Sequence, residues 1–104
     1  MKVSFLVPVY NTNPLLLRIC VNSILHALSD RHELILVDDG SDNDGTLEAL
    51  ERCSLVSNFD VTVARNPENF GVSYTLNKAA RLSSSDFLAP VDHDDLLVSN
   101  GFAT

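Results

Sequence analysis

FLAPVDHDD, residues 87–95, is an apolar run that leads directly into an acidic cluster. The apolar part predicts a buried β-strand, and three aspartates, Asp92, Asp94 and Asp95, follow it within four positions. Carboxylates at the end of a buried strand need water or a cation as a partner, because an unpaired buried charge is costly. Their hard oxygen atoms suit Mg²⁺ or Mn²⁺, whose open coordination positions can take the phosphates of a nucleotide. The alternative is a solvated turn whose aspartates cap the next helix.

The rest of the chain repeats the pattern of an apolar strand followed by an amphipathic helix. Strands are expected at residues 3–7, 33–37, 61–64 and 87–91, the first ending at Pro8. Helices are expected to begin at Pro14, Thr46 and Val72, with Asn13 capping the first and Ser41, Asp42 or Asp44 capping the second. This alternation predicts one α/β domain with a parallel sheet and no internal domain boundary.

Polar side chains follow each expected strand. They are Tyr10 and Asn11, Asp38 and Asp39, Asn66 and Asn69, and the aspartates of residues 92–95. Ligands of open α/β sheets bind outside the carboxyl ends of the strands, near the point where the strand order switches. We therefore expect these side chains to meet at one rim of the sheet.

Composition narrows the possible partners. The 104 residues are 45% hydrophobic and 20% charged, which predicts one small globular domain. The net charge of −7 argues against nonspecific binding of nucleic acid, because such binding needs a basic surface. Cys20 and Cys53 have no metal-binding spacing and are expected to be buried, reduced thiols. No apolar stretch is long enough for a membrane span, and the N-terminal run stops at Pro8 without a cleavage site, so a cytoplasmic location is expected.

Four motifs in this order resemble the family 2 inverting glycosyltransferases of the GT-A fold. They are PVYN at residues 8–11, VDDGSDND at 37–44, ENFGVSYTLNKA at 68–79 and VDHDDLL at 91–97. The resemblance covers essentially the whole chain and implies a Rossmann-like, mostly parallel twisted sheet with helices on both faces. The acidic motif and PVYNT look most similar to bacterial members that build O-antigen or other surface polysaccharides.

The resemblance implies roles for residues near the nucleotide. Pro8 and Tyr10 of PVYN would line its site, with the Tyr10 ring stacked on the base, although a tyrosine that merely covers the first helix is the alternative. Asp39 would accept a hydrogen bond from a base N–H, which favours uracil or thymine. Asp38 would instead cap the turn after the second strand, but the sequence does not separate the two aspartates.

The same resemblance assigns the acidic motif to a metal ion. Asp94 would bind Mn²⁺ or Mg²⁺ directly, Asp92 would face the ribose or a metal-bound water, and Asp95 is the next candidate ligand. His93 is expected to point away, because adjacent residues of a strand alternate faces.

Gly71 and Asn77 match a family segment whose loop approaches the nucleotide. For Gly71, a glycine at the entry to a helix is the alternative. The two interpretations stay open at the sequence level.

The implied reaction moves a sugar from a UDP- or dTDP-linked donor to a glycan or lipid-linked acceptor hydroxyl, with inversion. A general base is needed, and in the family it lies downstream of the acidic motif, so no residue up to Thr104 is assigned to it. We expect the nucleotide-sugar-binding part of a glycosyltransferase, with the acceptor-binding half absent and any membrane contact made by missing segments.

A metal-dependent nucleotide-binding module without transferase activity is the alternative function. A phosphoacceptor receiver domain is rejected, because it needs an aspartate after the third strand, where Arg65 and Asn66 stand.

Overall fold

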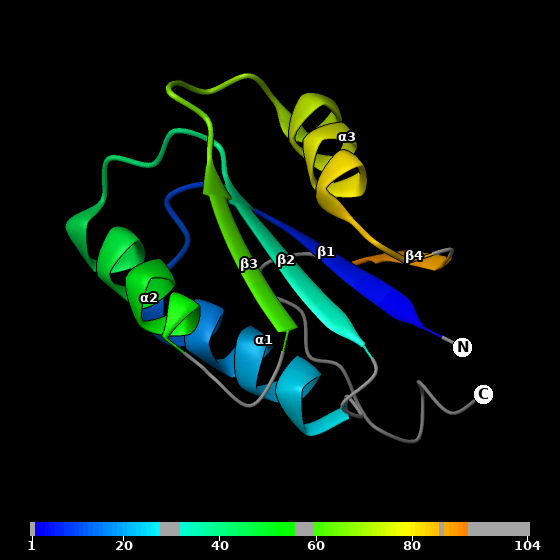
Figure 1. Ribbon diagram of the computed structural model, residues 1–104. Helices are drawn as coiled ribbons and strands as arrows, with labels where there is room; N and C mark the ends of the chain where they lie inside the picture. Colours follow the sequence, from blue (N-terminus) through cyan, green and yellow to red (C-terminus); the bar gives the residue numbers. More distant parts are fainter. Residues whose placement is uncertain (1, 28–31, 56–59, 86, 92–104) are drawn as a thin grey trace.

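The computed structural model of the chain describes residues 2–27, 32–55, 60–85 and 87–91. These residues form a parallel four-stranded sheet with the strand order β3-β2-β1-β4 (Figure 1). The strands are β1 (Val3–Val9), β2 (Glu33–Asp38), β3 (Asp60–Arg65) and β4 (Phe87–Pro90). The strand order switches between β1 and β4, so ligand binding is favoured at the carboxyl ends of the central strands.

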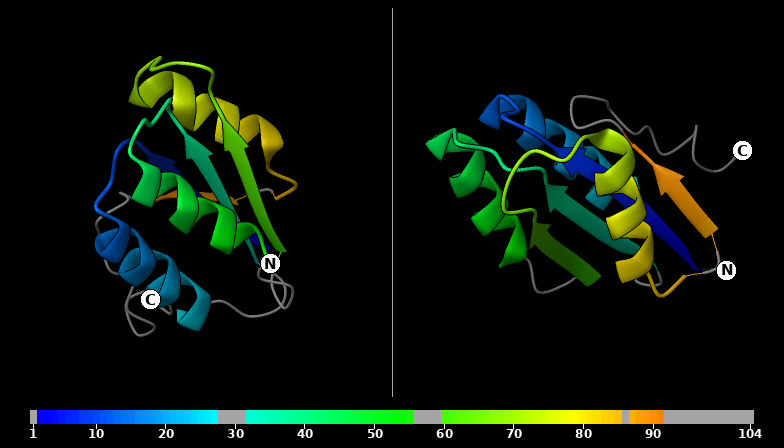
Figure 2. Two further views of the ribbon diagram at one scale, coloured as in Figure 1. Left: turned by 90° about the vertical axis from the view of Figure 1, so that its left-hand side faces the viewer. Right: turned by 90° about the horizontal axis from the view of Figure 1, so that it is seen from above.

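Three helices connect these strands: α1 (Pro14–Ala27), α2 (Asp44–Ser54) and α3 (Val72–Leu82). Figure 2 shows α1 and α2 on one side of the sheet and α3 on the other. The predicted α/β architecture, with a parallel sheet and helices on both faces, is therefore confirmed. No helix within the described residues is long and apolar enough to cross a membrane.

The sheet separates two apolar clusters of unequal size. Phe5 and Val7 of β1 pack with α1 and α2, whereas Leu6 faces α3, because successive side chains of a strand point to opposite faces. The larger cluster lies on the side of α1 and α2 and includes both cysteines. Cys20 and Cys53 are buried, reduced thiols, as predicted.

Helix starts agree with the sequence for α1 and differ for α2. Asn13 accepts a hydrogen bond from the Leu15 amide at 2.9 Å, so its predicted cap of α1 is confirmed. The cap of α2 is Asn43, whose Oδ1 accepts from the Thr46 amide at 3.0 Å. The prediction of Ser41, Asp42 or Asp44 was wrong. Ser41 and Asp42 are engaged elsewhere with Asn11, and Asp44 already lies inside the helix.

The prediction that β1 ends at Pro8 was also wrong. The strand continues to Val9, whose carbonyl accepts from the Asp39 amide on the β2 side. Alternate residues of a parallel strand bond to opposite neighbours, so the nitrogen of Pro8 faces the β4 side. The described pairing with β4 stops at Leu6 and Pro90. The Val91 amide donates to the Leu6 carbonyl at 2.9 Å, but Pro8 has no N–H with which to continue the ladder, so the described pairing with the edge strand β4 ends at this proline.

β4 differs from its prediction as a buried strand. Phe87 is 53% exposed and Leu88 is 45% exposed. The strand lies at the edge of the sheet and pairs only with β1 among the described residues, while α3 packs mainly over β1 and β2. An apolar run predicts a strand but not its place in the strand order, and that place decides its burial.

Candidate functional site

Asn11 joins the end of β1 to the turn that follows β2. Its amide donates to Ser41 Oγ at 2.8 Å, and its Nδ2 donates to Asp42 Oδ1 at 2.9 Å. Its Oδ1 accepts from the amides of Asp42 and Asn43 at 2.9 and 3.0 Å. Asn11 has a positive φ of 46°, a conformation that asparagine adopts more readily than most residues. These hydrogen bonds hold the carboxyl ends of strands β1 and β2 side by side.

Asp38 stabilises the turn after β2. Its Oδ2 accepts from the Ser41 amide at 3.0 Å and lies 3.3 Å from Arg65 Nε, and the side chain is almost fully buried. Its Oδ1 is buried and has no hydrogen-bond partner among the residues that the structure describes. These contacts match the structural role that the sequence left open between Asp38 and Asp39.

Asp39 holds the loop that leads into α3. Its Oδ1 accepts from Asn66 Nδ2 at 2.9 Å and from the Phe70 amide at 2.8 Å, and its Oδ2 accepts from the Gly71 amide at 2.9 Å. Burial raises the pKa of Asp39, but these hydrogen bonds, together with the hydroxyl of the Thr75 side chain, outweigh burial and hold the pKa below its ordinary value. Asp39 is therefore an ionised carboxylate at neutral pH.

Gly40 lets the same loop approach the turn closely. Its φ is +80°, and a Cβ atom built there would lie 2.5 Å from the Glu68 carbonyl carbon and 2.7 Å from the Asn69 nitrogen. A side chain at this position would therefore collide with the backbone of the loop. Sequence reasoning did not single out Gly40, although a glycine directly after the two aspartates was the available signal.

A small hollow lies at the carboxyl ends of β1 and β2. Its volume is about 60 Å³, and it is lined by Pro8, Val9, Tyr10, Asp39 and Val72. Three residues assigned to the nucleotide, Pro8, Tyr10 and Asp39, thus lie together. Tyr10 is 48% exposed, so its ring is accessible to a ligand.

Val72 is a lining residue that the sequence did not identify. It was expected only as the start of the third helix, and in the structure it is exposed and borders the hollow. Its place directly after Gly71, at the start of a helix that faces the rim, was the only signal for this position.

The remaining predicted residues have different positions. Gly71 precedes α3 with φ +97°, and its amide donates to Asp39, so it belongs to the rim through its backbone. Asn77 is exposed on α3 and does not line the hollow.

The predicted metal motif, Asp92, His93, Asp94 and Asp95, lies outside the described residues. Among the residues that the structure describes, no group of three or more His, Cys, Asp or Glu side chains could hold a metal ion.

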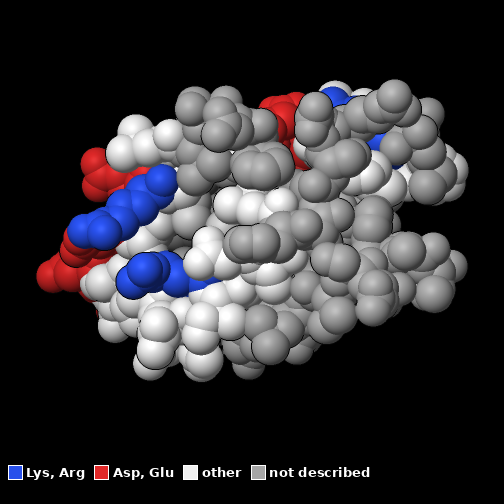
Figure 3. All heavy atoms as spheres, turned by 90° about the horizontal axis from the view of Figure 1, so that it is seen from below, with Lys and Arg blue, Asp and Glu red and all other residues white. Residues whose placement is uncertain are grey.

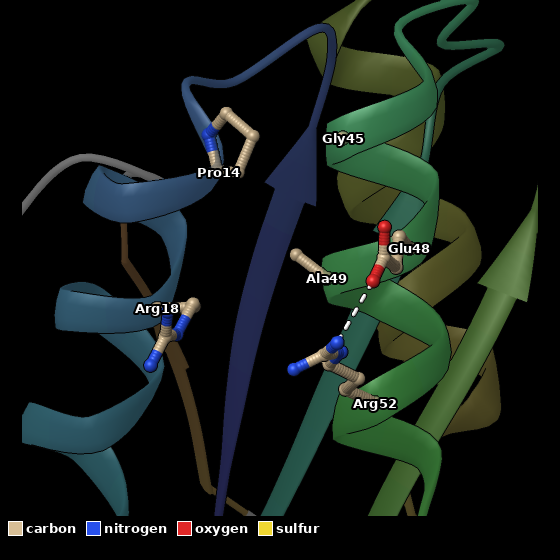
Figure 4. Close-up of a pocket in the computed structure, with 6 residues that line it drawn as sticks. All are labelled: Pro14, Arg18, Gly45, Glu48, Ala49 and Arg52. Carbon is tan, nitrogen blue, oxygen red and sulfur yellow. Dashed lines mark hydrogen bonds and ion pairs between the residues drawn. The ribbon is translucent and has the colours of Figure 1, made fainter.

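A larger hollow of about 210 Å³ lies between α1 and α2 (Figure 4). Its lining consists of Pro14, Arg18, Gly45, Glu48, Ala49 and Arg52. Arg52 forms an ion pair with Glu48 at 2.8 Å, and no predicted site residue within the described part of the chain lines this hollow. Basic and acidic side chains lie beside one another on the underside of the molecule, without a broad basic surface among its described residues (Figure 3). The smaller hollow at the strand ends is therefore the better candidate site, because predicted ligand-binding groups converge there.

A family model described as glycosyl transferase family 2 matches residues 4–100. The chain belongs to this family. It is 34% identical over 96 residues to YfnE of Bacillus subtilis, which is named an uncharacterised glycosyltransferase. The alignment covers 92% of this chain and 24% of YfnE. It is 29% identical over 101 residues to the poly(ribitol-phosphate) beta-glucosyltransferase of Bacillus spizizenii, covering 95% of this chain and 16% of that protein. The family 2 chain thus spans about a quarter or less of these two relatives.

Solved structures share the fold. The mannosyltransferase PcManGT from Pyrobaculum calidifontis, in complex with GDP-Man and Mn²⁺, superposes with a TM-score of 0.84 at 27% identity, covering 97% of this chain and 30% of PcManGT. S. aureus TarS 1-349, in complex with UDP-GlcNAc, gives a TM-score of 0.83 at 26% identity, covering 99% of this chain and 29% of that one. The Rossmann-like GT-A architecture implied by the sequence is thereby confirmed.

Proposed function

We propose that this family 2 chain is the nucleotide-sugar-binding part of an inverting glycosyltransferase that acts in bacterial surface-polysaccharide synthesis. The observation that carries the proposal is the hollow at the carboxyl edge of the sheet, where Pro8, Tyr10 and Asp39 lie together. The Bacillus spizizenii relative is named for poly(ribitol-phosphate), which supports a polymer as the acceptor. The site of action is the cytoplasm, at the inner face of the membrane.

The nucleobase occupies the hollow. The exposed ring of Tyr10 offers a flat apolar face for stacking. A carboxylate oxygen accepts two hydrogen bonds, so Asp39 Oδ1 is filled by its two donors, whereas Oδ2 has one donor and room for another. An ionised acceptor at this place suits the ring N–H of uracil or thymine, which makes UDP- and dTDP-sugars the proposed donors.

A divalent cation, Mn²⁺ or Mg²⁺, completes the proposed site. The donor set of Asp94, Asp92 and Asp95 consists of hard oxygen atoms, which fit either ion. Asp94 is the proposed direct ligand, and PcManGT, solved in complex with GDP-Man and Mn²⁺, supports the use of a divalent cation. When bound, the cation neutralises charge that develops on the departing diphosphate.

Sugar transfer with inversion requires a base that takes the proton of the acceptor hydroxyl. We assign no described residue to this role, so transfer is proposed for the whole protein and nucleotide binding for the present chain. Release of UDP from a UDP-sugar in the presence of Mn²⁺ and an acceptor separates a transferase from a binding module. If the chain binds UDP but releases no UDP from the UDP-sugar, it is a binding module without transferase activity.

Calorimetry with UDP tests the proposal. The chain should bind UDP in the presence of Mn²⁺, and a chelator should weaken binding. Asp94→Asn should weaken Mn²⁺-dependent binding by at least about tenfold, because a charged ligand to the metal is lost. The melting temperature without ligand should stay the same or rise, because repulsion between neighbouring carboxylates decreases.

Asp60→Asn is the matched control, since it removes an exposed carboxylate at the opposite end of the sheet, where Asp60 lies 3.6 Å from Lys2 Nζ. Equal UDP affinity with and without chelator would show that the acidic motif holds no catalytically relevant metal. Full Mn²⁺-dependent affinity in Asp94→Asn would move the metal ligand to Asp95.

A further inference from the structure

We propose that Asn66 is a positioning residue that orients Asp39 so that its Oδ2 is presented to the ligand. The proposal rests on the nucleotide-binding function proposed above, in which Asp39 accepts a hydrogen bond from the base. Nothing in the sequence motifs assigns a role to the Asn66 side chain. It was expected at the rim because it follows β3, and in the structure its side chain is fully buried there.

The hydrogen bonds of Asn66 fix its side-chain amide in one orientation. The side chain is 0% exposed. Its Nδ2 donates to Asp39 Oδ1 at 2.9 Å and to Thr75 Oγ1 at 3.1 Å, which uses both of its hydrogen atoms. Its Oδ1 accepts from Lys78 Nζ at 3.0 Å. An ammonium group only donates, so Lys78 prevents the amide from turning over and presenting its NH₂ group to the lysine.

This fixed amide determines which oxygen of Asp39 remains available. Asn66 Nδ2 and the Phe70 amide fill Oδ1, and the Gly71 amide takes one of the two acceptor positions of Oδ2. The carboxylate is therefore held at both ends, and its remaining acceptor capacity lies on Oδ2. Asp39 also lines the hollow beside Tyr10, so a ligand N–H that reaches this carboxylate meets Oδ2.

The backbone around Asn66 is held independently of its side chain. The Asn66 amide donates to the Asp38 carbonyl at 2.7 Å, and Gly40 packs against the loop at Glu68. Changing the Asn66 side chain should therefore alter the orientation of Asp39 more than the path of the loop.

Charged and titratable groups near this contact come from every element around it. Lys78 of α3 donates to Asn66, while Arg65 of β3 is committed to Asp38 of β2 and to the Ser41 carbonyl. Tyr10 lies across the hollow. Lys78 is thus the cation that contacts the Asn66 side chain among the described residues.

The test is Asn66→Asp, followed as UDP affinity in the presence of Mn²⁺ between pH 5 and pH 8. The new carboxylate lies at hydrogen-bond distance from Asp39, so the two like charges repel each other at pH 8. A proton shared between the two carboxylates removes this repulsion only at lower pH. The variant should bind UDP at least about tenfold more weakly than wild type at pH 8. The ratio of the two UDP affinities should approach one as the pH falls, because a proton then restores the contact between residue 66 and Asp39. Asn22→Asp, the same change on the exposed side of α1, should give a constant ratio at all pH values.

Two surface variants keep the test decisive if Asn66→Asp does not fold. Lys78→Met removes the ammonium group that fixes the amide and should weaken UDP binding several-fold, while Lys78→Arg keeps a donor and should restore it. Wild-type affinity in Lys78→Met, or an Asn66→Asp variant that binds UDP like wild type at pH 8, overturns the positioning role. If wild type itself does not bind UDP, the proposed function has failed, which is a distinguishable result.

Discussion

Asp39 accepts three hydrogen bonds while only 4% of the residue is exposed, so its charge contributes to stability as well as to binding. Its pKa is lower in the folded state than the value of about 3.9 for an unfolded aspartate. The stabilisation is therefore fully present above pH 4 and is lost as the pH falls through the folded pKa.

Asp39→Asn should lower the free energy of unfolding by about 1–3 kcal/mol at pH 7, because one amide donor then faces the new NH₂ group. In urea unfolding, the difference from wild type should be constant from pH 8 to pH 5 and should shrink below about pH 4. Asp60→Asn, at an exposed carboxylate, should show no comparable difference. A deficit in Asp39→Asn that persists unchanged at pH 3 would contradict the charged role of this residue.

Gly40 and Gly71 form a matched pair, since both have a positive φ but different surroundings. No atom of the described residues lies within 4 Å of a Cβ built on Gly71, whereas the one on Gly40 meets the backbone of Glu68 at 2.5 Å. Alanine at either position costs about 1–3 kcal/mol in backbone strain. Gly40→Ala should cost about a further 1–3 kcal/mol for the collision, as measured by chemical denaturation. Equal losses in the two variants would show that the loop moves away freely.

The sequence predicted the residues of the rim that lie within short motifs, and not those that depend on contacts between them. Pro8, Tyr10 and Asp39 follow predicted strands, so their convergence was expected. The contact between Asn66 and Asp39 joins residues 27 positions apart, and it exists because the loop after β3 folds back over the turn after β2. Local periodicity carries no information about that return. Asn66 was expected at the rim, but its contact with Asp39 became visible only in the structure, as did the roles of Gly40 and Val72.

At the scale of the elements, the order of strands and helices was predictable because each has the period of its type. Burial was less predictable. The apolar residues of β4 are as hydrophobic as those of β1, but β4 lies at an edge of the sheet and β1 lies between two neighbours. The cap of α2 was missed because several adjacent residues are good caps, and long-range partners decide which one remains available.

Asn43 provides the test of that cap. Asn43→Ala should destabilise the chain by about 1 kcal/mol, because the Thr46 amide loses its acceptor. Asn43→Asp keeps an acceptor in place and should be close to wild type in thermal unfolding. Asp44→Ala changes a residue that does not cap the helix, so a loss as large as that of Asn43→Ala would return the cap to Asp44.

At the scale of the whole molecule, the two faces of the sheet differ in how much apolar surface they bury. Every residue of β1 is buried, whereas α3 buries only Thr75 and Ala79 among its eleven residues. Regions with few buried apolar contacts open at lower free energy than the central strands. The helix beside the proposed ligand is therefore expected to be the less stable layer.

Native-state hydrogen exchange, read by mass spectrometry, should show α3 and residues 66–71 exchanging before β1 and β2. Saturating UDP with Mn²⁺ should slow exchange in residues 69–72, because Asp39 and Val72 line the hollow and Asp39 accepts from the amides of Phe70 and Gly71. At a ligand concentration of about 100 Kd, global opening should become less favourable by about 2.7 kcal/mol. The amides of α2 do not line that hollow. They should gain only the protection that comes from the less favourable global opening, so they serve as the internal control. Protection that rises equally in α2 and in residues 69–72 would place the nucleotide elsewhere on the molecule, and the base would then have to be sought away from Tyr10 and Asp39.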